Sequence, residues 1–431
     1  MTLTAMPKYE AYKDSGVEWI GDIPKDWELT KLGTCLTPVS IKNRADLPLL
    51  SITRELGVIE RDVEDLDSNH NFIPDDLSGY KVIESGQFGM NKMKAWQGSY
   101  GVSKHTGIVS PAYYIFKFKK DINPDFFHWA IRSHLYISFF ASASDGVRIG
   151  QWDLSKDRMK EIPFVFPQSS IQIAIAKFLN EKTTQIDEAI AIKEKQIALL
   201  NERKQILVQQ AITQGLYPTV PMKDSGVAWI GKIPAHWVVR RSKFVFCQRK
   251  ERARSDDIQL SATQAYGVIP QEQYEEMIGR KVVKISFHLE KRKHVEIDDF
   301  VISMRSFQGG LERAWASGCI RSSYVVLRPV NKNEVDAGFF SYMLKLPTYI
   351  NALQMTASFI RDGQDLNFDN FAQVDLFIPP IEEQKAIFYA IQSKVDEINK
   401  SIALFTDQIT KYQEYKTTLI NSAITGKIKV V

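Results

Sequence analysis

Two stretches of the chain place apolar residues at the spacing of one helix face. Residues 171–212 contain no glycine or proline, and their apolar residues follow one another at steps of three, four or seven: Ile175, Leu179, Ile186, Ile190, Ile197, Leu200, Leu207 and Ala211. The second stretch shows the same steps in Ile387, Ile391, Ile398, Ile402, Phe405, Ile409, Tyr412 and Leu419. A stripe of this period is typical of an amphipathic α-helix. The pattern therefore predicts two long helices.

Helix boundary residues flank both stretches. Pro167 precedes the first and Gly215 follows it, while Pro379 and Gly426 flank the second. A helix over 168–214 would run on the order of 60 Å, at about 1.5 Å per residue. Because so long a helix finds few partners in its own short turns, we expect the two stripes to bury each other as an antiparallel, coiled-coil-like pair. The alternative is that each helix folds separately against its own domain.

The residues before each helix contain short apolar runs separated by polar turns. In 28–166 the run 112–116 predicts a strand, and in 238–378 the run 323–327 does the same. Such runs are too short for helices and are rich in the β-branched and aromatic residues that strands favour.

Each of these globular parts also contains helical signals. Asn123 followed by Pro124 predicts the start of a helix that extends through Phe140, and its counterpart is expected from Asp336 to about Leu353. Short strands with few helices indicate an α+β fold.

The chain contains an internal repeat. Residues 14–27 return as 224–237 with ten of 14 positions identical, and further matches follow at offsets of 210 to 213. A period near 210 is too long for a solenoid and fits a duplicated domain with its connector. Gly, Pro and Trp carry most of the first match, and its tryptophans are interpreted as core residues: Trp19, Trp27, Trp229 and Trp237.

Composition narrows the class of protein. The apolar fraction is 44%, the formal net charge is +4, and three cysteines form no C-x-x-C pair. Packed globular units are therefore expected, in a reducing compartment, with neither disulfides nor structural zinc. No stretch reaches the roughly 18 apolar residues of a membrane span, so a cytoplasmic location is expected. The charge alone does not identify a nucleic-acid partner.

The motifs of common catalysts are missing from the sequence. It contains neither G-x-G-x-x-G nor G-x-x-x-x-G-K-[ST], and its seven histidines lack metal-ligand spacing. No segment resembles the Asn-Pro-Pro-Tyr type used by amino-methyltransferases. These absences favour a binding protein. Two alternatives stay open, a stand-alone methyltransferase or nuclease and a coiled-coil scaffold that binds only proteins.

The ordered set of repeated motifs resembles the specificity subunits of type I restriction-modification systems. The motifs are W-I-G-x-I-P-x-x-W, R-x-G-Q and P-x-x-x-x-Q-x-x-I, each present twice between about Tyr12 and Lys427. The resemblance implies two similar mixed α/β target-recognition domains separated by the antiparallel helix pair, with a pseudo-two-fold repeat. The implied divisions are 1–17 as N-terminal segment, 18–166 and 216–379 as recognition domains, and 167–215 and 380–427 as conserved helices.

The resemblance also implies a function and partners. The chain would bind a bipartite, asymmetric site on double-stranded DNA and be non-catalytic itself. It would dock two methyltransferase subunits and, through the complex, restriction subunits that translocate DNA. It would have no cofactor of its own, while those partners would use S-adenosylmethionine, ATP and Mg²⁺.

Candidate DNA contacts lie in matching polar stretches of the two halves. Arg, Lys and Gln are usual choices for base edges and phosphates, and the candidates are Lys92, Lys94, Gln97, Ser99, Lys104, His105, Arg148, Gln151, Arg305, Gln308, Arg313, Arg321, Arg361 and Gln364. The first stretch, which also contains Tyr100, is expected to be an exposed loop. Residues present in both copies, such as Gln97 and Gln308, point to a scaffold or phosphate role, because target-specific readers should diverge.

Overall fold

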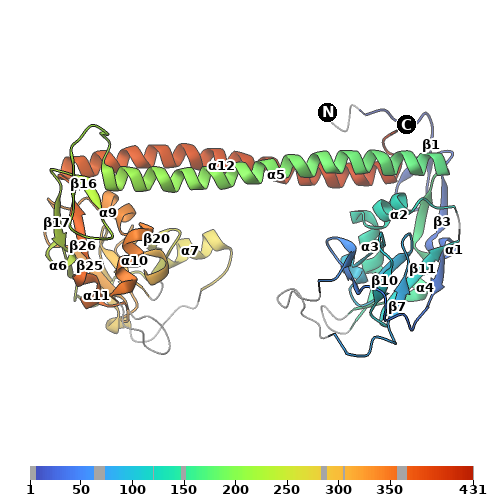
Figure 1. The fold of residues 1–431 in the computed structure, drawn as a ribbon, viewed down its shortest axis with the longest axis horizontal. Coiled ribbons are helices and arrows are strands. Elements are labelled where there is room, and N and C mark those ends of the chain that lie inside the picture. The colour runs from blue at the N-terminus through green and yellow to red at the C-terminus, as the bar shows by residue number, and fades with distance from the viewer. Residues whose placement is uncertain are drawn as a thin grey trace. The chain divides into compact units, whose positions relative to one another are not determined.

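The computed structural model describes residues 6–62, 73–119, 121–146, 152–282, 289–303, 306–356 and 366–430. The chain forms two compact units. Unit 1 comprises Met1–Glu194 and Phe405–Val431, and unit 2 comprises Lys195–Leu404. Figure 1 labels their helices and strands.

Unit 1 is built around a four-stranded antiparallel sheet of order β4-β11-β8-β9. Its elements are β1 (Tyr12–Asp14), β2 (Asp22–Pro24), β3 (Glu28–Lys31), α1 (Leu32–Cys35), β4 (Leu36–Val39), β5 (Leu50–Thr53), β6 (Gly57–Glu60), β7 (Lys81–Ile83), β8 (Phe88–Asn91), η2 (Ala95–Gln97), β9 (Tyr100–Val102), β10 (Gly107–Val109), β11 (Tyr113–Phe118), α2 (Pro124–Ile131), α3 (His134–Ser142), β12 (Ser144–Asp145), β13 (Asp153–Leu154), α4 (Lys156–Glu161), β14 (Pro163–Phe166) and the start of α5 (Ser169–Gln214). Antiparallel pairs β1–β2, β3–β14, β5–β6 and β7–β10 surround the sheet.

Unit 2 repeats this arrangement around a sheet of order β18-β25-β22-β23. Its elements are β15 (Met222–Asp224), β16 (Lys232–Pro234), β17 (Val238–Arg241), α6 (Ser242–Val245), β18 (Phe246–Gln248), β19 (Leu260–Thr263), β20 (Gly267–Pro270), α7 (Gln271–Ile278), η3 (Leu289–Lys291), β21 (Lys293–Val295), β22 (Phe300–Ile302), α8 (Ser306–Gly309), β23 (Glu312–Arg313), β24 (Gly318–Ile320), β25 (Val325–Pro329), α9 (Ala337–Met343), α10 (Pro347–Met355), α11 (Phe368–Gln373), β26 (Asp375–Ile378) and the first part of α12 (Ile381–Ile424). The last part of α12, from Phe405, belongs to unit 1, and the last part of α5, from Lys195, belongs to unit 2. The common strand order confirms the internal repeat and the predicted α+β class.

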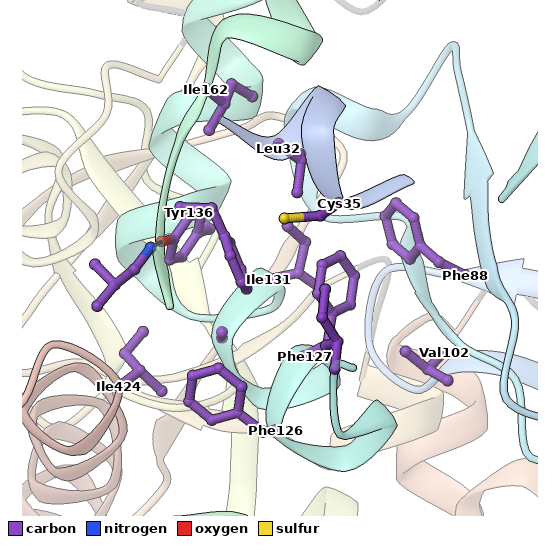
Figure 2. Close-up of a cluster of buried hydrophobic side chains, with 14 of the residues drawn as sticks. Leu32, Cys35, Phe88, Val102, Phe126, Phe127, Ile131, Tyr136, Ile162 and Ile424 are labelled. Carbon is purple, nitrogen blue, oxygen red and sulfur yellow. Dashed lines mark hydrogen bonds between the residues drawn. The ribbon is translucent and has the colours of Figure 1, made fainter. Parts of the chain in front are cut away.

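Aromatic and aliphatic side chains of strands and helices form the core of unit 1. Phe88 from the central sheet contacts Phe127 of α2 at a ring-centroid distance of 5.1 Å, and Phe127 contacts Phe164 of β14 at 5.3 Å. Ile424, near the end of α12, belongs to the same cluster (Figure 2). Residues almost 300 positions apart in the sequence are thus joined in one core.

The two long helices are confirmed, and they pack against each other within each unit. In unit 1, Ile175 and Leu179 of α5 share a buried cluster with Leu419 and Ala423 of α12, and Lys416 Nζ lies 2.6 Å from Asp187 Oδ2. The early part of α5 therefore pairs with the late part of α12, which is the antiparallel arrangement.

The second half of the pair belongs to unit 2. Ile212 of α5 is buried in one cluster with Ile387 and Ile391 of α12, and Lys204 Nζ donates to Asn399 Oδ1 at 3.2 Å. The alternative in which each helix folds separately against its own domain is therefore wrong.

The single helix expected over 124–140 is wrong, since two helices occupy this segment. α2 ends at Ile131, and Ser133 starts α3 by accepting the Tyr136 N–H with its hydroxyl. The counterpart is also two helices, α9 and α10, because Pro347 occupies the first position of α10.

The repeated glutamine of the P-x-x-x-x-Q motif has a structural role. Gln384 is fully buried; its Oε1 accepts the Asp336 N–H at 2.8 Å, and its Nε2 donates to the carbonyls of Glu334 and Pro379 at 2.9 and 2.8 Å. Gln172 makes two of the equivalent bonds in unit 1: its Oε1 accepts the Asn123 N–H, and its Nε2 donates to the Pro167 carbonyl. A side chain that both donates and accepts is needed here, which only an amide of this length supplies.

Replacing Gln384 with Met is expected to lower the free energy of unfolding of unit 2 by roughly 2–4 kcal/mol, because buried backbone groups lose their partners. Thermal or denaturant unfolding followed by circular dichroism measures the change. The control Lys385→Met, at the exposed neighbouring position, should change the value by about 0.5 kcal/mol or less. Equal effects of both substitutions would contradict the assigned role.

The tryptophans of the repeated motif do not share one environment. Trp27 and Trp237 are 1% and 0% exposed and belong to the cores, as expected. Trp229 is partly buried beside Phe377. Trp19 is 55% exposed and packs against Phe139, so its interpretation as a core residue is wrong. Within the described residues, no helix is long and apolar enough to cross a membrane.

Candidate nucleic-acid interface

One hairpin turn has the same scaffold in both units. Thr53 Oγ1 accepts the N–H of the third turn residue at 3.1 Å and donates to the Gly57 carbonyl at 3.2 Å. Thr263 does the same in unit 2, at 3.0 Å to the turn N–H and 3.0 Å to the Gly267 carbonyl. Both glycines have a φ of +75°, which disfavours other residue types. The turn is therefore fixed by the residues that the repeat shares.

The side chains carried by the two turns differ. In β5–β6 they are Arg54, Glu55 and Leu56, and in β19–β20 they are Gln264, Ala265 and Tyr266; all six residues are exposed. A common backbone with divergent exposed side chains suits the recognition of two different targets.

A basic residue at equivalent positions holds each turn. Arg132 donates from Nη2 to the carbonyls of Arg54 and Glu55 at 2.9 and 2.7 Å, and from Nη1 to the Tyr100 carbonyl at 2.7 Å. Burial lowers its pKa, but an arginine stays charged at neutral pH. Charge-assisted bonds to several carbonyls make the hairpin a preorganised element.

Lys345 takes this position in unit 2. Its Nζ donates to the Gln264 carbonyl at 2.9 Å and lies 2.7 Å from Oε2 of Glu312, whose side chain is 2% exposed. Burial raises the pKa of Glu312, while Lys345 opposes that shift. The turn of unit 2 is thus tied to a buried carboxylate of β23.

His128 supports β9 beneath the hairpin of unit 1. Its Nδ1 accepts the Val102 N–H at 3.2 Å. Burial, with the charges of Arg132 and Lys104, lowers its pKa to about 4. The imidazole is therefore neutral near neutral pH.

Two hollows flank the hairpin of unit 2. One, of about 580 Å³, is lined by residues 259–266 together with Arg292, Glu312 and Arg321. The other, of about 760 Å³, contains Tyr266, Lys345 and Trp315, and Trp315 is 51% exposed. Basic and aromatic groups together are what phosphates and base faces contact.

The candidate contacts of unit 1 have different environments. Lys94 and Lys104 are exposed, and Gln97 is half-buried. Lys92 is paired with Asp153 at 3.0 Å and His105 with Glu60 at 3.1 Å.

The expected exposed loop is only partly a loop. η2 and β9 occupy it, and Ser99 and Tyr100 are 2% and 0% exposed because they pack beneath the sheet edge. Exposure was wrongly expected for these two residues. Arg148 and Gln151 lie outside the described residues.

In unit 2, Gln308 and Arg321 are exposed. Arg313 is paired with Asp298 at 2.6 Å and lies over the Trp315 ring at 4.2 Å. Arg305, Arg361 and Gln364 lie outside the described residues. The roles of all these residues in DNA contact stay predictions.

Sequence reasoning did not single out the turn residues or their anchors. Arg132 and Lys345 occupy matching positions at an offset of 213, within the range of the repeat. The shared Thr and Gly around three unlike residues were the available signal for the turns.

Known proteins resemble this chain along nearly all of its length. A relative from Methanocaldococcus jannaschii, provisionally named the specificity subunit of the type I restriction enzyme MjaX, is 22% identical over 434 residues, which span 95% of this chain and 96% of the relative. No family model matches the chain.

Two solved structures share the fold. One, from work on complex assembly and conformational transition of the type I R-M system, has a TM-score of 0.67 at 13% identity and covers 94% of this chain and 99% of that chain. The crystal structure of the HsdS subunit from Thermoanaerobacter tengcongensis has a TM-score of 0.53 at 14% identity, with 94% and 98% covered.

Proposed function

We propose that this chain is the DNA sequence-recognition subunit of a type I restriction-modification enzyme. The observation that carries the proposal is the hairpin turn, which has one scaffold and one basic anchor type in both units but different exposed side chains. The likeness to specificity subunits over 95% of the chain supports it.

The two units would read the two halves of one DNA site. Because the turn residues differ, the half-sites should differ and the whole site should be asymmetric. A homodimer of a single domain would instead require a palindrome. Exposed Arg and Lys side chains would contact phosphates, while turn residues such as Gln264 would reach base edges.

Partner subunits would perform the chemistry. The chain would be non-catalytic and cytoplasmic, would dock two methyltransferase subunits, and would join restriction subunits through the complex. Those partners would use S-adenosylmethionine, ATP and Mg²⁺.

The helices leave apolar side chains exposed for such docking. Ile173 and Ile192 are 54% and 57% exposed in unit 1, and Leu199 and Leu404 are 54% and 55% exposed in unit 2. These exposed apolar side chains are the candidate contacts for the docked methyltransferase subunits. Phe388 of α12 is not available for docking in this way, because it contacts Tyr342 and covers the backbone of Gly338.

Mapping methylated adenines tests the proposal directly. A host that expresses this chain with its methyltransferase partner should show one bipartite, asymmetric methylated motif that is lost when this gene is deleted. Methylation that persists without this chain would contradict the proposal.

Replacing Lys94 and Lys104 together with Ala is expected to weaken DNA binding to a similar extent for target and non-target sequences. Each lost phosphate contact lowers the slope of log K against log salt by about 0.9, so the double variant should lose up to about 1.8. Fluorescence anisotropy over a salt series measures the slope, with Lys177→Ala on the exposed face of α5 as the control. A loss confined to the target sequence would assign these lysines to base recognition instead.

A further inference from the structure

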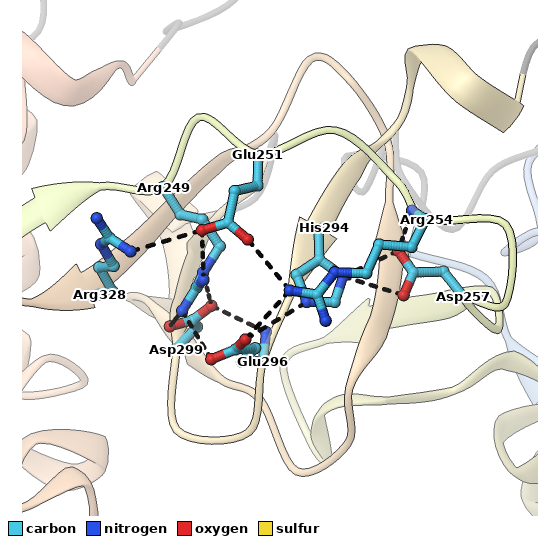
Figure 3. Close-up of polar contacts among 8 residues, drawn as sticks. All are labelled: Arg249, Glu251, Arg254, Asp257, His294, Glu296, Asp299 and Arg328. Atoms are coloured by element: carbon cyan, nitrogen blue, oxygen red, sulfur yellow. Dashed lines mark hydrogen bonds and ion pairs between the residues drawn. The ribbon is translucent and has the colours of Figure 1, made fainter.

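Eight charged or titratable side chains of unit 2 form one polar cluster, which Figure 3 shows in close-up. The members come from the segment after β18, from β21, β25 and the turn before β22: Arg249, Glu251, Arg254, Asp257, His294, Glu296, Asp299 and Arg328. None of the residues that define the hairpin turn belongs to it, so the cluster is separate from the candidate DNA interface.

The most buried part of the cluster is an ion pair between Arg249 and Asp299. Arg249 is 4% exposed, and its Nε and Nη2 donate to the carboxylate of Asp299 at 2.6 and 3.2 Å. Arg249 also donates to one oxygen of each glutamate: from Nη1 to Glu251 Oε1 at 2.9 Å and from Nη2 to Glu296 Oε2 at 3.1 Å. The other oxygen of each glutamate, Oε2 of Glu251 and Oε1 of Glu296, does not contact Arg249 and lies near Arg254 instead.

The ring nitrogen Nε2 of His294 lies near these two glutamate oxygens. Its side chain is 1% exposed, and Nδ1 lies 2.9 and 3.0 Å from the two carboxylate oxygens of Asp257. Since a carboxylate only accepts, this contact places a proton on Nδ1, so that Nε2 is the nitrogen that carries the lone pair when the imidazole is neutral. Among the described residues Nε2 has no hydrogen-bond partner, and it lies 3.7 Å from Glu296 Oε1.

Within the described part of the chain, the partner shared by these two glutamate oxygens is a half-exposed arginine. Arg254 Nη2 lies 3.3 Å from Glu251 Oε2 and 3.5 Å from Glu296 Oε1, at the outer limit of a hydrogen bond. The Arg254 side chain is 53% exposed. Exposed ion pairs of this kind contribute little stability, because water competes for both partners.

We propose that Glu251, His294 and Glu296 form a binding site for a divalent transition-metal ion, which enters by displacing Arg254. One donor atom from each of the three residues lies within 4.8 Å of the other two. Donors around a tetrahedral Zn²⁺ are roughly 3.4 Å apart, given bonds of about 2.0–2.1 Å. The two glutamate side chains, 43% and 36% exposed, have room to close that difference.

Charge and orientation both favour such an ion. With Arg254 displaced, the four carboxylates of the cluster pair within it with Arg249 and Arg328, and Lys332 adds a more distant positive charge near Glu296, so net negative charge remains for a divalent cation to balance. The bond from Nδ1 to Asp257 is the arrangement that orients metal-binding histidines in proteins. One imidazole with two carboxylates suits Zn²⁺ or Mn²⁺ better than Ca²⁺, which prefers oxygen donors alone.

Metal titration of the full chain tests the proposal. Untagged protein is dialysed against a chelator and titrated with Zn²⁺ by calorimetry, and Co²⁺ replaces Zn²⁺ for absorption spectra. The expected result is one saturable site per chain, with a Co²⁺ spectrum typical of nitrogen and oxygen ligands. Glu251→Gln should weaken binding at least tenfold, because an amide is a poor ligand. Arg254→Ala should strengthen it severalfold, because the competing cation is removed.

Arg252→Ala is the matched control, because it removes the same charge two positions from Arg254, at an exposed residue that is not a member of the cluster. It should change affinity less than Arg254→Ala does. His134→Ala, at an exposed histidine of unit 1, controls for surface binding. The absence of saturable binding overturns the proposal. So does binding that Glu251→Gln leaves unchanged, or that Arg254→Ala affects no more than Arg252→Ala.

Discussion

Exchange of residues 28–166 for the equivalent part of a related chain is expected to replace one half of the methylated sequence and to leave the other half unchanged. Unit 1 has its own core and its own hairpin turn, so its base contacts do not depend on the turn of unit 2. Each base contact discriminates by about 1–3 kcal/mol, and several contacts together select one half-site almost completely.

The measurement is the methylated motif in hosts that express the native or the exchanged chain with the same partner subunits. Exchange of residues 238–378 is the reciprocal control and should change only the other half. If either exchange altered both halves, the two units could not be independent readers.

Substitution of Leu199 by Glu is expected to weaken methyltransferase docking by about a hundredfold, which corresponds to about 2.7 kcal/mol. Leu199 is 54% exposed on α5, and burial of an apolar side chain at the centre of an interface contributes on this scale. A carboxylate at this position would be desolvated without a partner. Because the side chain is not part of the core, the fold should be retained.

Native mass spectrometry of the assembled complex measures the effect. The native chain should bind two methyltransferase subunits, and the variant should lose occupancy while its DNA-binding affinity persists. Gln205→Glu, an exposed polar position on the same helix, is the control for added charge. Saturation of the native chain at one subunit would contradict the two-site proposal.

The sequence by itself determined the two long helices and the repeat. Helix α5 covers Ser169–Gln214 and α12 covers Ile381–Ile424, close to the limits set by Pro167, Gly215 and Gly426. These signals are local: an apolar period of 3.6 residues, proline before the first turn and a left-handed glycine after the last. The repeat also indicated that the two units share one fold, but the strand order of their sheets was known only from the structure.

Tertiary contacts decided what local pattern could not. Arg132 and Lys345 look like surface charges in the sequence, but the fold brings each against the carbonyls of a distant turn. Ser99 and Tyr100 lie in a polar, glycine-punctuated stretch and are nevertheless buried, because β9 pairs with β8 at the edge of the central sheet.

The polar cluster of unit 2 shows the same limit most clearly. His294 and Glu251 are 43 positions apart, and no metal-binding spacing connects them in the sequence. The antiparallel bridge between Arg252 and Lys293, with the bond from the His294 N–H to the Glu251 carbonyl, brings their side chains together. Periodicity and boundary residues specify an element through its neighbours along the chain, whereas a site depends on distances that only long-range packing sets.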